Sequence, residues 1–337
     1  MATRQVTVKD IARRLRLHYT TVSKALRNHP DISSKTKHRV LSLAEELDYH
    51  PNSIAKSLKR QTTSTLGVIV PSIKNDFFSA VISGIEEVAY GREFNTVVCQ
   101  SNESADREAI HVDTMISNRV AGVLVSVAQT TQAGAHFKTL QRQGIPLVFF
   151  DRVCDDIEAG QVVVDDYEGA RKVVNHLLQS GYRNIAHAAG MENTSVARQR
   201  YRGYLDALAE NGIPFDPELI THGGLEEKDG VAALQQLLSR ARMPQAIFAV
   251  NDPVAVGVYT EAKRRGLKIP RDIALVGFGD NRLSSYLDPP LTTVKQSPYE
   301  LGKAAAEMLL RRIEHPARNA GAEVEVIKTE LIVRNST

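Results

Sequence analysis

Three polar side chains near the start of the chain have the types and the spacing needed to read DNA bases. Tyr19 and Thr20 begin a segment whose apolar residues recur at helical spacing, and Lys24 follows Thr20 by one helical turn. We therefore expect all three on one side of a helix, near the end that enters a major groove. A threonine offers a hydroxyl or a methyl group to a base edge, and a lysine donates to O6 or N7 of guanine.

The charge of the surrounding segment fits this interpretation. Thirteen Lys and Arg residues stand against five acidic residues in positions 1–60, a formal charge of +8, whereas the rest of the chain carries −5. A basic head on a mildly acidic body favours contact with a polyanion. Two alternatives stay open: a solvated surface with chance clustering, and a three-helix module that binds another protein. The charge argues against the second.

A second set of side chains lies next to apolar segments that have the length of buried strands. Ligands of open α/β sheets bind beyond the carboxyl ends of the strands, so these side chains are candidates for a ligand site. A guanidinium with carboxylate and amide neighbours suits polyhydroxylated or anionic ligands, and an aromatic face suits a sugar or a base ring. The candidates are Phe77, Phe78, Asp151, Arg198, Arg200, Asn251, Asp280 and Gln296. The competing structural roles are core packing for the phenylalanines, solvent exposure for Arg198, and helix capping for Asp166 and Asp252.

The sequence contains no motif of an enzyme or of a metal site. It lacks a G-x-G-x-x-G after a strand, a G-x-x-x-x-G-K-[ST] loop, a G-x-S-x-G elbow and an H-E-x-x-H pair. Cys99 and Cys154 lie far apart, which leaves a zinc site unsupported. The neighbours Asp155–Asp156 and Asp165–Asp166 would point to opposite faces of a strand and make poor acid–base partners. We therefore expect no enzymatic activity, no cofactor and no metal.

The basic head is expected to consist of three short helices. All 21 glycines lie from Gly67 onward, which indicates compact helices with short turns before it. Thr7 has the position of a helix cap, residues 19–26 form a second helix after a short turn, and Ser33 or Ser34 caps a third. Two helices joined by a turn of three to four residues form the helix-turn-helix pattern.

The body alternates apolar, strand-like segments with amphipathic helical segments. The expected strands are Leu66–Val70, Asn95–Cys99, Gly122–Val125, Pro146–Phe150, Val162–Val164, Ile185–Ala188, Leu219–Ile220, Ala246–Val250, Ile273–Val276 and Leu291–Val294. The expected helices lie near 80–90, 104–118, 131–143, 167–180, 197–211, 228–240 and 253–265. This alternation is typical of doubly wound parallel sheets, and its restart after Val164 indicates two lobes with a cleft between them. The expected fold class is α/β, with an all-α head before the two lobes.

The composition is that of an ordinary globular protein, with 42% apolar and 24% charged residues. No stretch approaches 18 uncharged apolar residues, and the N-terminus lacks the apolar region of a signal peptide. Two cysteines are too few for a disulfide framework and fit a reducing compartment. These features predict a cytoplasmic protein.

The head resembles the DNA-binding head of the LacI/GalR (lactose-repressor/galactose-repressor) family of bacterial transcriptional regulators. The resemblance rests on the TVS of the second helix, on ISSKTKHRV in the third helix and on YHPNSIAKSL after it, in the order and spacing of the family. It continues through the whole chain, whose body then resembles the periplasmic sugar-binding proteins. One departure is Arg16, which stands where many members have glycine in the turn.

The resemblance implies a role for individual residues of the head. The base-reading positions of the family fall on Tyr19, Thr20 and Lys24. The remaining DNA-contacting positions fall on Thr7, Thr21, Ser23, Asn28, Asn52, Ala55, Leu58 and Lys59. The last four belong to the hinge helix of the family, which orders on operator DNA and wedges a leucine, here Leu58, into a base step of the minor groove.

In the body, the resemblance places effector contacts at Asp151, Arg200 and Asn251. Gly279 stands where many members have an aspartate that binds a hydroxyl of the ligand. Either Asp280 replaces that aspartate from the next position, or the effector lacks the hydroxyl.

The resemblance predicts a domain order of head (1–50), hinge helix and linker (51–61) and effector-binding body (62–337). We expect the first lobe to comprise 62–163 with 293–325, and the second 164–292 with 326–337. The implied function is that of a repressor that binds a pseudo-palindromic operator as a homodimer. A small molecule, a sugar or a related metabolite, would control it from the cleft. The competing hypothesis is a small-molecule binding protein or an enzyme whose basic head serves another purpose.

Overall fold

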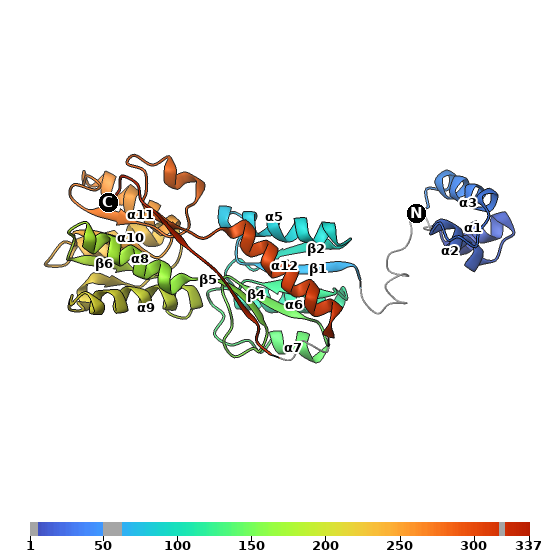
Figure 1. Ribbon diagram of the computed structural model, residues 1–337, viewed down its shortest axis with the longest axis horizontal. Helices are drawn as coiled ribbons and strands as arrows, with labels where there is room; N and C mark the ends of the chain where they lie inside the picture. Colours follow the sequence, from blue (N-terminus) through green and yellow to red (C-terminus); the bar gives the residue numbers. More distant parts are fainter. Residues whose placement is uncertain (1–5, 50–62, 317–320) are drawn as a thin grey trace. The chain divides into compact units, whose positions relative to one another are not determined.

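The computed structural model describes residues 6–49, 63–316 and 321–337 (Figure 1). The chain divides into two compact units, residues 1–63 and 64–337. This division falls within the polar stretch Gln61–Thr65, and the first glycine of the chain, Gly67, follows shortly after it. Within the described residues, none of the helices is long and apolar enough to cross a lipid bilayer.

The head is built from three helices, α1 (Val8–Leu15), α2 (Tyr19–Leu26) and α3 (Ser34–Glu46). Each helix begins after a polar side chain that accepts a backbone N–H: Thr7, His18 and Ser33, respectively. One apolar face of each helix closes the core, which contains Ile11, Ala12, Val22, Ala25, Val40 and Ala44. The predicted helix-turn-helix is confirmed.

The turn between α1 and α2 has a left-handed residue at Arg16, with φ 53° and ψ 43°. Its N–H donates to the carbonyls of Ala12 and Arg13, which ends α1. The turn therefore keeps the positive φ that suits a glycine, and the arginine accepts a conformation that costs a non-glycine residue roughly 1 kcal/mol.

The first lobe of the body contains a six-stranded, wholly parallel sheet in the order β11-β5-β4-β3-β1-β2. Its strands are β1 (Thr65–Val70), β2 (Asn95–Gln100), β3 (Gly122–Val125), β4 (Leu147–Phe150), β5 (Gly160–Val164) and β11 (Val324–Ile327). On one face, α5 (Asp76–Gly91) and α12 (Pro298–Glu314) lie side by side (Figure 1). The other face packs against α6 (Ala105–Ser117) and α7 (Phe137–Arg142).

The second lobe contains a four-stranded parallel sheet in the order β7-β6-β8-β9. Its strands are β6 (Ile185–Ala188), β7 (Ile220–Thr221), β8 (Ala246–Ala249) and β9 (Ala274–Val276). One face packs against α8 (Asp166–Gln179) and α9 (Ser195–Glu210), and the other against α10 (Glu227–Leu238) and α11 (Asp252–Arg264). Both sheets are therefore doubly wound, as predicted, and their strand order reverses between β1 and β3 and between β6 and β8. Such reversals are the preferred ligand-binding points of α/β sheets.

The chain crosses between the lobes three times, and two of the crossings differ from the expected boundaries. β10 (Thr293–Lys295) pairs antiparallel with β12 (Glu330–Ile332), and Val294 packs in the core of the second lobe under α8. Residues 293–295 therefore belong to the second lobe, whereas the prediction assigned them to the first. Residues 326–327 belong to β11 in the sheet of the first lobe, whereas the prediction assigned them to the second. The crossings are near residues 165, 296–297 and 328–329.

One expected helix is shorter than its pattern. The helix near 131–143 comprises only α7, Phe137–Arg142, because acidic side chains bind the polar groups of the preceding segment. Glu108 accepts the Ala128 N–H and the Thr131 hydroxyl, each at 2.8 Å, and Asp156 accepts the Gly134 N–H. These bonds hold the segment in an irregular loop before α7.

Three helix pairs of the body cross where a glycine lets the backbones touch. An added Cβ at Gly84 of α5 would overlap the Tyr299 carbonyl of α12, and one at Gly302 would overlap the Val81 carbonyl. The same holds for Gly230 and Gly257 between α10 and α11, and for Gly203 of α9 against Tyr167 of α8. Close packing of helices on the sheet faces therefore depends on these positions.

We expect Gly84→Ala to lower the free energy of unfolding by about 3 kcal/mol, because the methyl group meets backbone that cannot move aside. Gly91, in the same helix, has no atom within 4 Å of an added Cβ, so Gly91→Ala should raise stability by about 0.5 kcal/mol. Urea unfolding of both variants measures the two changes. Equal effects at the two positions would contradict the packing argument.

Candidate DNA-binding surface and effector cavity

The exposed face of α2 carries the side chains predicted to read DNA. Val22 and Ala25 of this helix are buried in the head's core, which turns Tyr19, Thr20 and Lys24 toward the outside. The Tyr19 side chain is 51% exposed, and that of Lys24 is 45% exposed. The Tyr19 ring lies 4.5 Å from the ring of His18, between centroids, and remains half-exposed.

Local contacts hold several of these side chains in place. The Thr20 hydroxyl lies 2.7 Å from Nδ1 of His18, and Arg27 donates to the Ser23 hydroxyl at 2.9 Å. The Lys24 ammonium donates to Asp31 at 3.0 Å. This hydrogen bond keeps the pKa of Asp31 below its usual value. All are surface contacts, which exchange readily for contacts with DNA.

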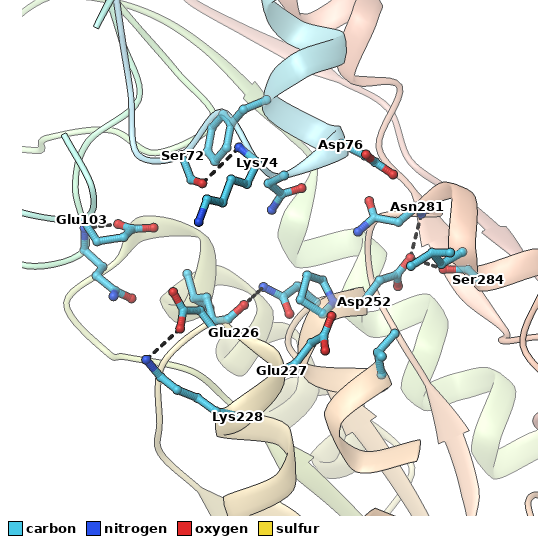
Figure 2. Close-up of a pocket in the computed structure, with 18 of the residues that line it drawn as sticks. Ser72, Lys74, Asp76, Glu103, Glu226, Glu227, Lys228, Asp252, Asn281 and Ser284 are labelled. Carbon is cyan, nitrogen blue, oxygen red and sulfur yellow. Dashed lines mark hydrogen bonds and ion pairs between the residues drawn. The ribbon is translucent and has the colours of Figure 1, made fainter. Parts of the chain in front are cut away.

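A cavity of about 460 Å³ opens between the two lobes (Figure 2). One wall comes from the first lobe: the loop after β1 with the start of α5, together with Glu103, Gln129 and Arg152. The other wall comes from the starts of α10 and α11 and from residues 281–284. Both walls lie beyond the carboxyl ends of strands, at the point predicted from the fold class.

Asp252 organises the wall of the second lobe. It accepts hydrogen bonds from the hydroxyls of Ser284 and Thr293, each at 2.6 Å, and from the Asn281 N–H at 2.8 Å. Burial raises the pKa of Asp252. The neighbouring Asn251 caps α11 by accepting the Val254 N–H, and its amide donates to the Leu225 carbonyl. These bonds fasten the loop after β9 and the start of α10 to the start of α11.

Arg152 and Glu103 form a corresponding pair in the wall of the first lobe. Arg152 donates to both carboxylate oxygens of Glu103, at 3.0 and 2.8 Å, and its side chain is only 8% exposed. Its guanidinium also lies 5.8 Å from the centre of the Phe78 ring. Both charges of this pair are therefore balanced within the wall.

A buried charge cluster lies close to the crossing at residue 165, outside the residues that line the cavity. Arg200 donates to Asp166 at 2.8 Å and to the Val250 carbonyl at 2.6 Å, and its guanidinium stacks 3.8 Å from the centre of the Phe278 ring. Burial raises the pKa of Asp166 to about 6, even though Arg200 opposes the shift. Burial also raises the pKa of Asp151, whose charge acts on Asp166.

Comparisons with known proteins agree with both parts of this geometry. Residues 7–52 match the model of bacterial regulatory proteins of the lacI family, and residues 174–337 match a periplasmic binding protein-like domain. The repressor CytR of Escherichia coli (strain K12) is 33% identical over 331 residues, covering 98% of this chain and 96% of the relative. The chain belongs to the LacI family of bacterial regulatory proteins.

Other relatives within the LacI family extend the likeness. The ribose operon repressor of Haemophilus influenzae is 32% identical and covers 93% of each chain. A lac repressor dimer bound to operator and the anti-inducer ONPF superimposes with a TM-score of 0.87, at 26% identity and 99% coverage of both chains. The regulator CelR in complex with cellobiose gives 0.75, at 25% identity, covering 99% of this chain and 100% of that one.

The structure brings most of the predicted DNA contacts of this LacI-family protein onto one unit. Tyr19, Thr20 and Lys24 share the outer side of α2, and Thr21 and Ser23 lie on the same helix with partial exposure. Asn28 is exposed after the helix, and Thr7 caps α1, where its hydroxyl lies 2.6 Å from Asp10. Asn52, Ala55, Leu58 and Lys59, with the hinge helix, lie outside the described residues.

The predicted effector residues fall into separate places. Phe78 and Asn251 line the cavity, whereas Phe77 is buried in the core of the first lobe against Phe78. Asp151 and Arg200 belong to the buried charge cluster. Arg198 lines a smaller cavity of about 160 Å³ and pairs with Asp155. Asp280 forms an ion pair with Arg334 at 2.7 Å. Gln296 is buried, and its amide nitrogen has no hydrogen-bond partner among the described residues. Direct effector contact by these residues stays a prediction.

Several cavity-lining residues were not among the candidate effector residues predicted from the sequence. They are Ser72, Lys74, Asn75, Asp76, Glu103, Gln129, Arg152, Leu225, Glu226, Glu227, Lys228, Asp252, Pro253, Val256, Asn281, Leu283 and Ser284. Many of them lie in the first turn of a helix that follows a strand. This position was the only feature of the sequence that could have indicated that they line the cavity. For Asp252, the sequence analysis left helix capping open as the competing structural role.

Proposed function

We propose that this LacI-family protein is a transcriptional repressor that binds a pseudo-palindromic operator through the α2 helices of a homodimer. The observation that carries the proposal is the outer face of α2, where Tyr19, Thr20 and Lys24 are exposed on a segment of charge +8. The lac repressor relative was solved as a dimer bound to operator, which supports the same assembly here. Exposed Val97 and Val98 on the edge strand β2 add apolar surface for a partner copy.

We further propose that a small molecule, a sugar or a related metabolite, controls operator binding from the cavity between the lobes. The cavity takes its walls from both lobes, so a ligand that touches both favours one arrangement of the lobes over another. Operator binding and ligand binding are then coupled, and each changes the affinity for the other by the same factor. The cellobiose complex of CelR supports a ligand of this kind.

We also propose that the protein acts in the bacterial cytoplasm, where operator DNA is found, and that it has no catalytic role. The relatives are regulators, and the buried charges near the cavity are held by internal hydrogen bonds that connect elements of the fold. The competing enzyme hypothesis would need one of these groups to be free to act on a substrate.

Lys24→Ala tests the DNA-reading role. After an operator has been selected from random duplexes with the wild-type protein, we expect the variant to lose about 10- to 100-fold in preference for that operator over random DNA, because one base contact is removed. Binding measurements on both DNAs give the ratio. Lys35→Ala is the matched control, since Lys35 is an exposed lysine of the head at the start of α3. It should leave the preference unchanged. If Lys24→Ala weakened binding to the selected operator and to random DNA by the same factor, a base contact by Lys24 would be contradicted.

A further inference from the structure

We infer that the cavity selects an uncharged ligand with several hydroxyl groups, and that it discriminates against the phosphorylated form of the same molecule. This inference rests on the proposed effector site and specifies its ligand class. It follows from how the charges of the cavity wall are placed and paired.

Three helices begin at the cavity, and each already carries its own carboxylate there. Asp76 is in the first turn of α5, Glu227 in that of α10 and Asp252 in that of α11 (Figure 2). A helix start favours a negative group, which is why such positions often bind phosphate. Here the side chains of the protein take that place, so a phosphate would meet negative charge at each of the three helix starts.

The cations of the wall leave little compensation for an anionic ligand. Arg152 is paired with Glu103, and Lys228 with Glu226 at 2.7 Å. Among the lining residues that the structure describes, the remaining charges are Lys74 against Asp76, Glu227 and Asp252. A phosphate monoester, with close to two negative charges, would therefore face the exposed carboxylates of Asp76 and Glu227, with the buried Asp252 behind them, and one ammonium group.

The remaining surface suits a neutral polar molecule. Carboxylates accept hydrogen bonds without donating any, so Asp76 and Glu227, both exposed, would pair with ligand hydroxyl groups. The side-chain oxygen of Gln129 is buried beside the cavity and has no hydrogen-bond partner among the described residues, which provides a further acceptor. Apolar side chains complete the lining: Phe78, Leu225, Pro253, Val256 and Leu283. Acceptors combined with apolar surface suit a neutral molecule that offers hydroxyl groups to the acceptors and an apolar face to the rest of the lining.

Matched pairs of compounds test the inference on the full-length protein. The probes are common nucleosides with their 5′-monophosphates, ribose with ribose 5-phosphate, glucose with glucose 6-phosphate, and inorganic phosphate alone. Thermal shift identifies the pairs that bind, and calorimetry measures both Kd values. We expect the unphosphorylated member to bind at least about 10-fold more tightly, and inorganic phosphate to produce no shift.

Charge-neutralising variants make the test specific to the cavity. Glu227→Gln should reduce the preference for the unphosphorylated member about threefold, because one repulsive charge is removed. Glu300→Gln removes an exposed carboxylate from the first turn of α12, outside the cavity-lining residues, and should leave the preference unchanged. Tighter binding of a phosphorylated member would overturn the inference. The absence of a thermal shift with every compound tested would also overturn it. Operator binding by the same preparation then shows whether the proposed function itself survives.

Discussion

Replacing Arg200 with alanine is expected to lower the free energy of unfolding by about 3–5 kcal/mol. The substitution leaves the carboxylate of Asp166, which is 5% exposed, without its cation, and it leaves the Val250 carbonyl without its donor. It also removes the stacking partner of the Phe278 ring. Urea unfolding followed by circular dichroism measures the loss.

Two comparisons separate this cause from a general effect of removing an arginine. Arg198, two residues earlier, pairs with the exposed Asp155 and is itself 43% exposed, so Arg198→Ala should change stability by less than about 1 kcal/mol. The loss at Arg200 should also shrink as the pH falls from 8 to 5. Similar losses for the two variants would contradict the buried pair.

The sign of the pH effect follows from the pKa of Asp166. Burial raises this pKa to about 6, above that of the unfolded chain, so the folded protein binds a proton more readily between about pH 6 and pH 4. Stability from this group therefore increases as the pH falls through this window. Without Arg200 the pKa rises further, since the opposing cation is gone, and protonation at pH 5 then relieves the unpaired charge. A loss that is larger at pH 5 than at pH 8 would contradict the argument.

The fold could be predicted from local patterns because its elements are regular. The boundaries of α2 and of β3 and β6 agree with the predicted ones, since apolar spacing and flanking caps are local properties of the chain. The helix near 131–143 is shorter because Glu108, 23 residues earlier, accepts the hydroxyl group of Thr131, its first expected residue. Contacts at such separation leave no trace in a local pattern.

The cavity was harder to predict than the fold. Phe77 and Phe78 are neighbours in the sequence and both belong to the core of the first lobe, and only Phe78 also lines the cavity. The family resemblance predicted a ligand contact for Arg200, whereas its buried ion pair with Asp166, on a different helix, could not be read from a local pattern. Lys74 and Glu227 belong to different lobes, and only the way in which the lobes face each other brings both to one cavity.

Operator affinity is expected to fall by about 1,000-fold or more between 50 and 200 mM salt. The head would place its lysines and arginines against DNA phosphates, and each neutralised phosphate releases bound cations whose gain in entropy shrinks as salt rises. A homodimer doubles the number of these contacts. The logarithm of the association constant should therefore decrease linearly with the logarithm of the salt concentration.

The variants Lys24→Ala and Lys35→Ala are expected to change this salt dependence in different ways. Lys24→Ala should change the selected sequence more than the slope, because a base contact releases few cations. Lys35→Ala should reduce the slope by about one for each phosphate contact that it removes. A slope that responds in the opposite way would place Lys24 on the DNA backbone.

The most direct measurement of the central claim is the equilibrium affinity of the full-length protein for its selected operator, titrated with salt. A steep linear decrease from tight binding at low salt, with weaker binding to random duplex throughout, is the predicted result. Absence of measurable affinity for any duplex at 50 mM salt would contradict the claim that the head binds DNA.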